Sequence, residues 1–181
     1  MPDPASNEHH APVHGITIWL DSYDDIFSDF DSREYDHRAL SDDFLAEMRK
    51  LIREKNDAIE DFHLLLPSGM RDAETEKVIS KRLHDYFHQS YERLSEEMRA
   101  LRRKAILFSA VGLFFLLTAG YISFLKPEMA LLHLLMTTCE PAGWFFVWMG
   151  YDVFANVITR KKPERDFCDT MSASTISFKA L

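Results

Sequence analysis

Residues 105–125, "AILFSAVGLFFLLTAGYISFL", form a long run without a single charged side chain. A helix needs about 20 apolar residues to cross the hydrocarbon core of a bilayer, so this run predicts a membrane span. About a dozen of its residues are Leu, Ile, Phe or Val, each of which favours insertion by roughly 0.3–0.6 kcal/mol. A buried helix of a water-soluble core would need more apolar surroundings than the first hundred residues supply.

A second apolar segment follows at residues 129–158. It is longer than one perpendicular crossing needs, so we expect it to be tilted, broken or partly re-entrant. Pro141 is the expected break, because proline removes a backbone donor and clashes with the preceding turn. The intervening "KPE", residues 126–128, predicts a tight hairpin tip. The predicted fold class is therefore mainly α, built on a membrane hairpin of two transmembrane helices.

Basic residues flank both apolar segments on the side away from the hairpin tip. They are Arg99, Arg102, Arg103, Lys104, Arg160, Lys161, Lys162 and Arg165. Positive charge accumulates on the cytoplasmic side of membrane proteins, so both termini are expected in the cytoplasm and the chain in the cell inner membrane. Residues 1–14 have neither a basic nor an apolar region of a cleaved signal peptide, and we expect a disordered tail.

Residues 15–104 predict an acidic cytoplasmic helical domain. One helix is expected from Ser41 or Asp42 to Leu66, ended by the turn residues 67–69. A second begins near Asp72 and continues into the first span. Its apolar stripe, which indicates a helical hairpin or short coiled coil, consists of Ile79, Leu83, Phe87, Leu94, Met98 and Leu101.

Two short stretches alternate apolar and polar residues and predict strands. They are "GITIWLD" (Gly15–Asp21) and "STISFKA" (Ser174–Ala180). The second lies in the predicted cytoplasmic tail, residues 159–181. Since both ends of the chain are expected in the cytoplasm, the two strands can pair with each other or across subunits.

An aspartate-rich segment separates the first strand from the first helix. Its candidate ligands for a divalent cation, a class of ion that prefers carboxylate oxygens, are Asp24, Asp25, Asp29 and Asp31. The spacing lacks the central glycine and closing glutamate of an EF-hand loop, and a solvated acidic loop is the competing interpretation. The histidines of the N-terminal "EHHAPVH" are read as part of a disordered tail.

A polar stripe runs along the second apolar segment. On a helix, residues at steps of three and four share one face, and the stripe consists of His133, Thr137, Glu140, Trp144, Trp148 and Asp152. An acidic side chain at mid-membrane costs about 2.5–3.5 kcal/mol on insertion scales, and such residues usually face a bundle interior or a water-filled path. An unpaired Glu140 that faces lipid is therefore not expected.

Three interpretations of Glu140 stay open. It can support the helix break at Pro141 by hydrogen bonding, a structural role. It can form a proton or cation pathway with His133 and Asp152. It can also contribute to a ring of carboxylates in an oligomer, and such a ring selects cations.

The stretch "EPAGWF" with Trp148 resembles the pore signature of the mitochondrial calcium uniporter. That resemblance implies a ring carboxylate at Glu140, with Trp144 and Trp148 walling or buttressing the filter. The family has Trp and Asp ahead of the glutamate, whereas this chain has Met136 and Thr137. The second acidic ring is therefore absent, which argues against calcium selectivity.

The chain as a whole resembles a family of uncharacterised bacterial two-span membrane proteins. The shared motifs are "DIFSDFDSR" (Asp25–Arg33), "LSDDF" (Leu40–Phe44), "EPAGWF" (Glu140–Phe145) and "ISF" (Ile176–Phe178). The resemblance implies a membrane location and this layout, and it implies no activity.

No nucleophile elbow, phosphate-binding loop, dinucleotide fingerprint or metal quartet is present, so neither an enzyme nor a cofactor is predicted. The net charge of −8 argues against a nucleic-acid partner. Two functions stay open: an oligomeric small-cation channel or transporter, or a membrane-anchored scaffold whose cytoplasmic domain binds a protein partner. A pore needs at least three or four copies, because two spans cannot enclose a path, so a homo-oligomer is expected.

Overall fold

The computed structural model describes residues 15–55, 61–125 and 129–180. The predicted disordered tail and hairpin tip lie outside these ranges. The described chain is mostly helical and divides into two compact units. The first unit contains residues up to His88 together with those from Phe167 onward, and the second contains Gln89–Asp166.

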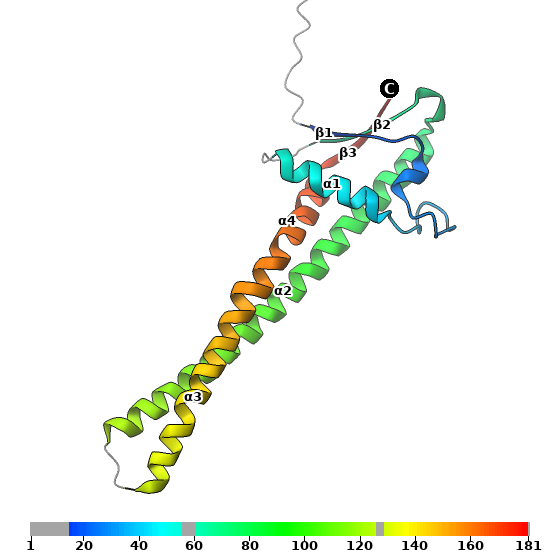
Figure 1. Cartoon of the computed structure of the whole chain (residues 1–181). Helices are drawn as coiled ribbons and strands as arrows, with labels where there is room; N and C mark the ends of the chain where they lie inside the picture. The colour runs from blue at the N-terminus through cyan, green and yellow to red at the C-terminus, as the bar shows by residue number, and fades with distance from the viewer. Residues whose placement is uncertain (1–14, 56–60, 126–128, 181) are drawn as a thin grey trace, which may run out of the picture. The chain divides into compact units, whose positions relative to one another are not determined.

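The first unit contains a small sheet of three parallel strands, in the order β1-β2-β3 (Figure 1). The strands are β1 (Gly15–Trp19), β2 (Asp61–Leu66) and β3 (Thr175–Ala180). Both strands predicted from alternation are therefore present. They do not pair with each other, because β2 lies between them, with Phe62 opposite Ile16 on one side and Ile176 on the other.

The expected helix from residue 41 or 42 to Leu66 was wrong in its second half. Helix α1 ends at Lys55 and residues 61–66 form the central strand. Phe62, Leu64 and Leu66 of this strand are fully buried, and His63 is only 8% exposed, whereas Leu65 is half-buried and Asp61 exposed. The consecutive leucines 64–66 hide the alternation expected of a strand, which made this segment look like the end of a helix.

The core of the first unit lies on one face of the sheet. Its buried side chains come from all helices of this unit and from the strands: Ile16, Ile18, Phe44, Leu45, Met48, Phe62, Leu64, Leu66, Ile79, Leu83, Phe87, Phe167 and Met171. The rings of Phe87 and Phe167 meet edge to face with centroids 5.6 Å apart. Residues at the start of α2 and the end of α4 are thereby packed together in one unit.

Two helical connections link the parallel strands. The helix α1 (Asp42–Lys55) lies between β1 and β2 in the chain. Between β2 and β3 come α2 (Ala73–Phe124), α3 (Ala130–Asp152), the π-helical turn η3 (Val153–Ile158) and α4 (Thr159–Ala173). Both apolar segments therefore belong to one crossover connection between neighbouring strands.

The expected break at Pro141 is wrong. Helix α3 is continuous from Ala130 to Asp152, with Pro141 inside it. Pro141 removes the donor for the carbonyl four residues earlier, that of Thr137, a loss that helices packed against a neighbour tolerate. Two hydroxyls of the same turn bond other carbonyls: Thr137 donates to that of His133 at 2.8 Å, and Thr138 donates to that of Leu134 at 3.0 Å. The re-entrant alternative is excluded with it.

The irregular part of this segment is η3, which no sequence signal predicted. Beyond it, the predicted tail contains a further helix, α4. Its sequence, "TRKKPERDFCDTMSA", is strongly polar and includes Pro163. Its buried residues, Phe167, Cys168 and Met171, form a narrow apolar stripe, so tertiary packing rather than composition makes the segment helical.

In the second unit, α2 and α3 approach each other closely at three glycines. A Cβ atom at Gly112 would lie 2.6 Å from the backbone nitrogen of Val147 and 2.7 Å from the carbonyl oxygen of Gly143. A Cβ atom at Gly143 would meet the Leu116 side chain at 2.7 Å, and one at Gly150 would meet the carbonyl of Ala105 at 2.8 Å. Small residues permit this backbone contact, the usual means of tight packing between membrane helices.

We expect Gly112→Ala to destabilise the helix pair by about 1–3 kcal/mol, the usual cost of overpacking, because the new methyl group would overlap backbone atoms of α3. The matched control is Gly120→Ala on the same helix, where a Cβ atom has nothing within 4 Å. Thermal unfolding of the detergent-solubilised full chain measures the difference. Equal melting temperatures of the two variants would contradict the close helix contact.

Candidate functional site

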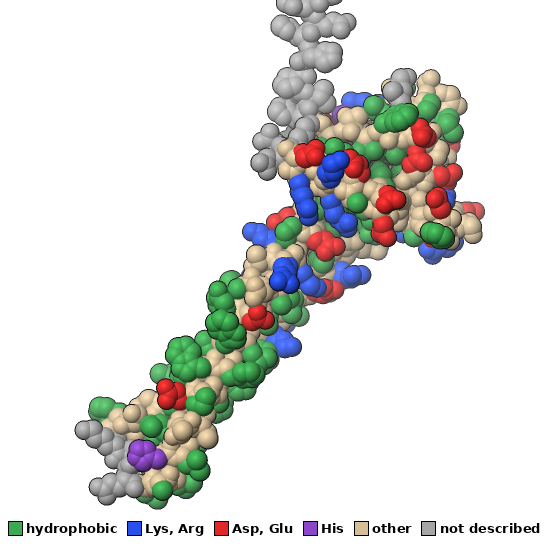
Figure 2. All heavy atoms as spheres, viewed as in Figure 1, with side chains coloured by type: hydrophobic (Ala, Val, Ile, Leu, Met, Phe, Trp, Pro, Cys, Tyr) green, Lys and Arg blue, Asp and Glu red, His purple; other side chains and the backbone are tan. Residues whose placement is uncertain are grey.

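The six residues of the predicted polar stripe all lie on α3, and their side chains are exposed in the single chain. Trp144 is 62% exposed and Trp148 is 69% exposed. Apolar side chains cover the visible surface of this part of the second unit, with few charges among them (Figure 2). The stripe is therefore left largely uncovered in a single chain, although Glu140 and Trp144 border α2 at a shared cavity.

Glu140 lies deep within the apolar part of the helix pair. It lines a cavity of about 350 Å³ with α2 residues between Leu116 and Ser123, so it sits at the level of Gly120 or slightly before it. At 1.5 Å per residue, that level is about 20 Å from Ala105 and about 10 Å from Leu125 along the helix. If these helices span a bilayer, a carboxylate this far from either end is too distant from the bulk water to reach it by extending its side chain.

The cavity has an apolar end and a more polar end. Its lining residues are Leu116, Ala119, Gly120, Ser123, Met136, Glu140 and Trp144. Ser123 and Gly120 lie toward the end of α2 at Phe124, whereas Trp144 and Leu116 lie toward the opposite side. Glu140 therefore shares this cavity with the hydroxyl of Ser123 on one side and the ring of Trp144 on the other.

The stripe does not gather its three ionisable groups into one cluster. Along α3, His133 is about 10 Å from Glu140 and Asp152 is about 18 Å from it, from the helical rise alone. Asp152 is the last residue of α3, where the side-chain amide of Asn156 donates to its carboxylate at 2.6 Å. A direct proton relay among the three side chains is therefore not formed within one chain.

An aromatic groove lies beside Glu140 on the same helix. Its volume is about 840 Å³, and its lining residues are Pro141, Trp144, Phe145, Val147, Trp148 and Tyr151. Trp148 and Tyr151 pack with ring centroids 5.7 Å apart. This surface offers an acidic group bordered by large apolar side chains, which suits contact with another helix.

Three of the four aspartates proposed as cation ligands are engaged separately by other groups of the protein. Asp25 caps η1 (Tyr23–Ile26) by accepting from the backbone N–H groups of Asp21 and Ser22. Asp24 pairs with Arg38 at 2.5 Å. Among the residues that the structure describes, no three His, Cys, Asp or Glu side chains gather as a metal site. Donors of the protein therefore already engage Asp24, Asp25 and Asp31, and the described residues give no support to the cation-site hypothesis.

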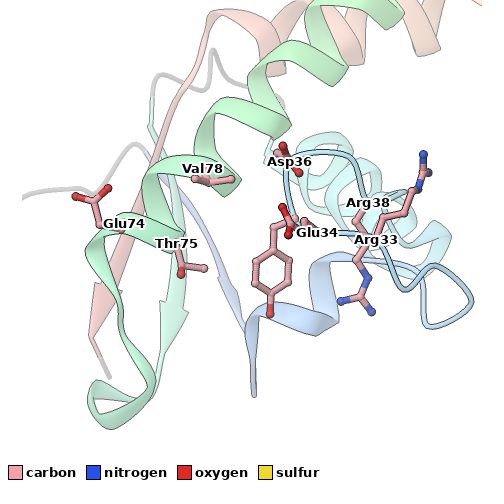
Figure 3. Close-up of a pocket in the computed structure, with 8 residues that line it drawn as sticks. Arg33, Glu34, Asp36, Arg38, Glu74, Thr75 and Val78 are labelled. Carbon is pink, nitrogen blue, oxygen red and sulfur yellow. The ribbon is translucent and has the colours of Figure 1, made fainter.

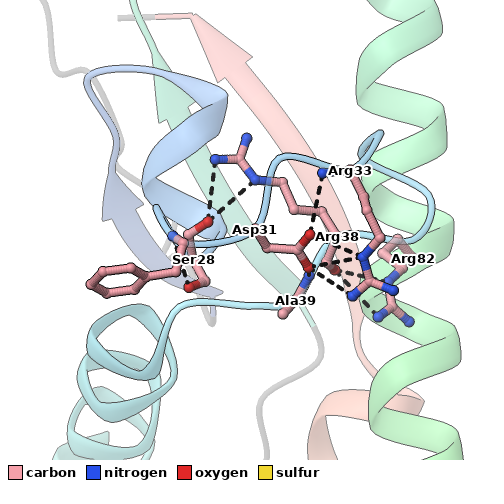
Figure 4. Close-up of polar contacts among 7 residues, drawn as sticks. Ser28, Asp31, Arg33, Arg38, Ala39 and Arg82 are labelled. Carbon is pink, nitrogen blue, oxygen red and sulfur yellow. Dashed lines mark hydrogen bonds and ion pairs between the residues drawn. The ribbon is translucent and has the colours of Figure 1, made fainter.

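Asp31 holds the loop that these aspartates share. Its carboxylate accepts from the side chain of Arg33 at 2.7 Å and from the backbone N–H of Ala39 at 2.7 Å (Figure 4). The hydrogen bonds from Arg33, and then that from Ala39, hold the pKa of Asp31 well below its usual range. Arg38 donates to the carbonyl of Ser28, and Arg82 donates to the carbonyl of Arg38 (Figure 4).

This fixed loop, residues 28–39, carries one fully exposed aromatic side chain. Phe30 has no contact that reduces its accessibility, with a relative exposure of 101%. Its neighbours Phe27 and Leu40 are buried and join the two ends of the loop by an isolated bridge. The hydrogen bonds of Asp31 and Arg38 thus fix the loop in a conformation in which the Phe30 side chain is exposed to solvent.

A pocket of about 610 Å³ lies between this loop and the start of α2 (Figure 3). Its lining residues are Arg33, Glu34, Tyr35, Asp36, Arg38, Glu74, Thr75 and Val78. Charges of both signs surround an apolar floor. No single ligand charge is favoured, so the pocket carries no functional assignment.

Sequence reasoning missed a polar group on the sheet. The Nδ1 atom of His63 lies 2.8 Å from the hydroxyl oxygen of Ser177, and its Nε2 atom lies 3.0 Å from the Lys179 amine. A lysine ammonium only donates, so Nε2 accepts and the proton resides on Nδ1, which donates to Ser177. Ser177 is not activated as a nucleophile in this arrangement. The sequence pattern predicted a helix for residues 61–66, so it could not indicate that His63 lies beside Ser177 and Lys179.

The acid stability of the first unit depends on Asp31. Its pKa in the folded protein is lowered, so its contribution to the free energy of unfolding is present above about pH 4, the ordinary aspartate range. The contribution is lost as the pH falls further, because the unfolded chain binds the proton first. We expect Asp31→Asn to lower stability at pH 6 and to flatten the decline below pH 4.

Chemical unfolding of the full chain between pH 3 and pH 6 measures this change. The matched control is Asp29→Asn, two residues away on the same loop and exposed. If both variants keep the pH profile of the original chain, Asp31 does not hold the loop.

These sites are defined by geometry alone. No protein-family model, no curated protein and no solved structure matches this chain.

Proposed function

We propose that this chain is a two-pass integral protein of the cell inner membrane with its sheet-bearing unit and both termini in the cytoplasm. Its copies associate through the face of α3 that carries Glu140. In the assembly, the Glu140 carboxylates bind small cations along a path through the membrane.

The membrane location is supported by length, composition and exposure. Helix α2, and the helix formed by α3 with its continuation to Ala173, are long and apolar enough to span a bilayer, with mean hydropathies of 2.1 and 1.2 in their most apolar windows. Only 22% and 11% of those windows are buried inside the chain, so these are not core helices of a soluble fold. Tyr121 and Tyr151, both exposed, are placed where interfacial aromatic residues are common.

The common side of both termini is supported by the sheet. Strands β2 and β3 precede α2 and follow α4, and they are hydrogen-bonded neighbours from Asp61–Thr175 to Leu66–Ala180. A chain that leaves this sheet and returns to it crosses the membrane an even number of times. The basic residues on the sheet side of both spans support a cytoplasmic location of that side.

One observation carries the functional part of the proposal: Glu140 is exposed at mid-depth on an apolar helix, bordered by exposed tryptophans. Facing lipid would cost about 2.5–3.5 kcal/mol, so the carboxylate requires a partner or a water-filled path. No basic residue lies in the span to neutralise it. Copies arranged with this face inward would bring several carboxylates together, and such rings attract cations.

We expect the full chain, extracted in a mild detergent, to form a closed assembly of three or more copies by native mass spectrometry. Two spans per copy cannot enclose a path with fewer. In proteoliposomes, Glu140→Gln is expected to reduce cation flux by about tenfold or more, because a neutral amide lacks the charge that attracts the ion.

The matched control for the flux experiment is Glu96→Gln, the same change at an exposed position outside the apolar segment. A monomer or dimer would rule out the pore. An unchanged subunit count with equal flux for both variants would instead leave Glu140 as a packing residue.

A second candidate function is a membrane-anchored scaffold, and Phe30 is the observation that favours it. A fully exposed aromatic side chain on a loop fixed by Asp31 and Arg38 loses little conformational freedom on binding, a property of interaction hot spots. Exposed acidic residues such as Asp29 and Glu34 lie on the same loop. The complementary partner is a protein with an apolar pocket rimmed by basic residues.

For the scaffold function, we expect Phe30→Ala to leave the melting temperature unchanged, because the side chain buries no surface in the fold. The same variant is expected to lose any cytoplasmic protein that co-purifies with the original chain. Met70→Ala, which removes another exposed apolar side chain of the first unit, is the control that should retain it. Equal retention by both variants would argue against Phe30 as the contact.

A further inference from the structure

The second unit carries a cluster of cations immediately beside its apolar part. The basic collar, as we name it, consists of Arg99, Arg102, Arg103 and Lys104 on α2. All four side chains are exposed. They occupy a little more than one helical turn directly before Ala105, where the apolar run begins, so their charges project to several sides of the helix.

Among the described residues, the positive charges of Arg102 and Arg103, in the middle of the collar, have no acidic partner. Helix α2 has no acidic residue from Met98 to its end at Phe124, and residues 153–163 of the returning helix have none either. Among the described residues, no carboxylate forms an ion pair with Arg102 or Arg103. By contrast, Lys161 of α4 is paired with Glu97 at 2.5 Å, and this pairing lowers the pKa of Glu97.

The register of the helix pair gives the depth of these cations. Ala105 lies opposite Gly150, and the collar extends about 1.5–9 Å from that level by the helical rise. The headgroup layer of a bilayer is about 5–8 Å thick on each side. If the apolar helices span the bilayer, Arg102, Arg103 and Lys104 fall within the layer of lipid phosphates. The Lys104 amine also lies 5.7 Å from the centre of the Phe108 ring, at the apolar boundary.

The exposed cations of α4 are farther away. Arg160 and Lys162 follow Gly150 by ten and twelve residues, which places them about 15–18 Å from the same level. They lie beyond the headgroup layer and do not contact the lipid phosphates. They attract these phosphates only through long-range electrostatic interaction, which salt screens over about 8–10 Å. The collar cations and the cations of α4 should therefore differ in how strongly they bind anionic lipid and in how much salt weakens that binding.

We propose that the basic collar binds the phosphate of anionic phospholipids, with Arg102 and Arg103 as the principal contacts. Guanidinium groups hold phosphate oxygens through paired hydrogen bonds. The bound lipids would form a negatively charged ring around α2 at the cytoplasmic face. This inference rests on the proposed membrane location and is independent of ion conduction.

The test is native mass spectrometry of the full chain in detergent with equal concentrations of phosphatidylglycerol or phosphatidylcholine. We expect preferential retention of phosphatidylglycerol, which Arg102→Gln with Arg103→Gln reduces by about twentyfold, at roughly fivefold for each cation near the surface. Arg160→Gln with Lys162→Gln should reduce it less than about fivefold. That smaller effect should disappear at about 0.5 M salt.

The charge-matched control is Lys77→Gln with Lys81→Gln, two exposed cations of α2 within the first unit. Equal retention of both lipids, or an equal loss in this control, would overturn the proposal. Displacement of the lipid by millimolar inorganic phosphate would show a soluble-phosphate site instead and overturn it as well. Carbonate extraction distinguishes failure of the proposed membrane location from failure of the proposed lipid site. Release of the chain from the membrane refutes the membrane location, whereas a retained chain without lipid preference refutes only lipid binding by the collar.

Discussion

The parallel pairing of β2 with β3 is the constraint on which the rest of the structure depends. These neighbouring strands are separated in sequence by the whole of α2, α3 and α4, so their hydrogen bonds close a loop of more than one hundred residues. A crossover of this kind must return the chain to the end of the sheet where the next parallel strand begins. Helix α1 meets this requirement between β1 and β2, whereas the connection from β2 to β3 contains α2, α3 and α4.

The returning helix is held to the outgoing one by backbone contact. Gly112, Gly143 and Gly150 remove the side chains that would keep the helices apart, so α3 lies against α2 along one face. The flank of α3 beside this contact remains exposed, and it carries Glu140 between Thr137 and Trp144. The same packing thus creates the helix pair and exposes the group that gives the candidate site its chemistry.

Charged side chains have different partners in the two units. In the first unit, acidic residues are paired with arginines of the same loop, as Asp31 and Asp24 show, and their charge is used to fix backbone shape. In the second unit, Glu140 and the collar arginines lack such partners among the described residues. Under the proposed membrane location, partners for these charges would come from another copy, from ions or from lipid, and this is the physical basis of both proposals.

The sequence by itself determined the apolar segments, their basic flanks, the strands at both ends and the shared face from His133 to Asp152. These features depend on local composition and periodicity, which the residues carry directly. Only the tertiary structure decided that residues 61–66 form the central strand, because the consecutive leucines 64–66 hide the period of two. It also decided that Pro141 stays within a helix and that the Asp31 carboxylate accepts from Arg33 and Ala39. Each of these depends on partners distant in the chain or on the sum of many weak contacts, which no local pattern encodes.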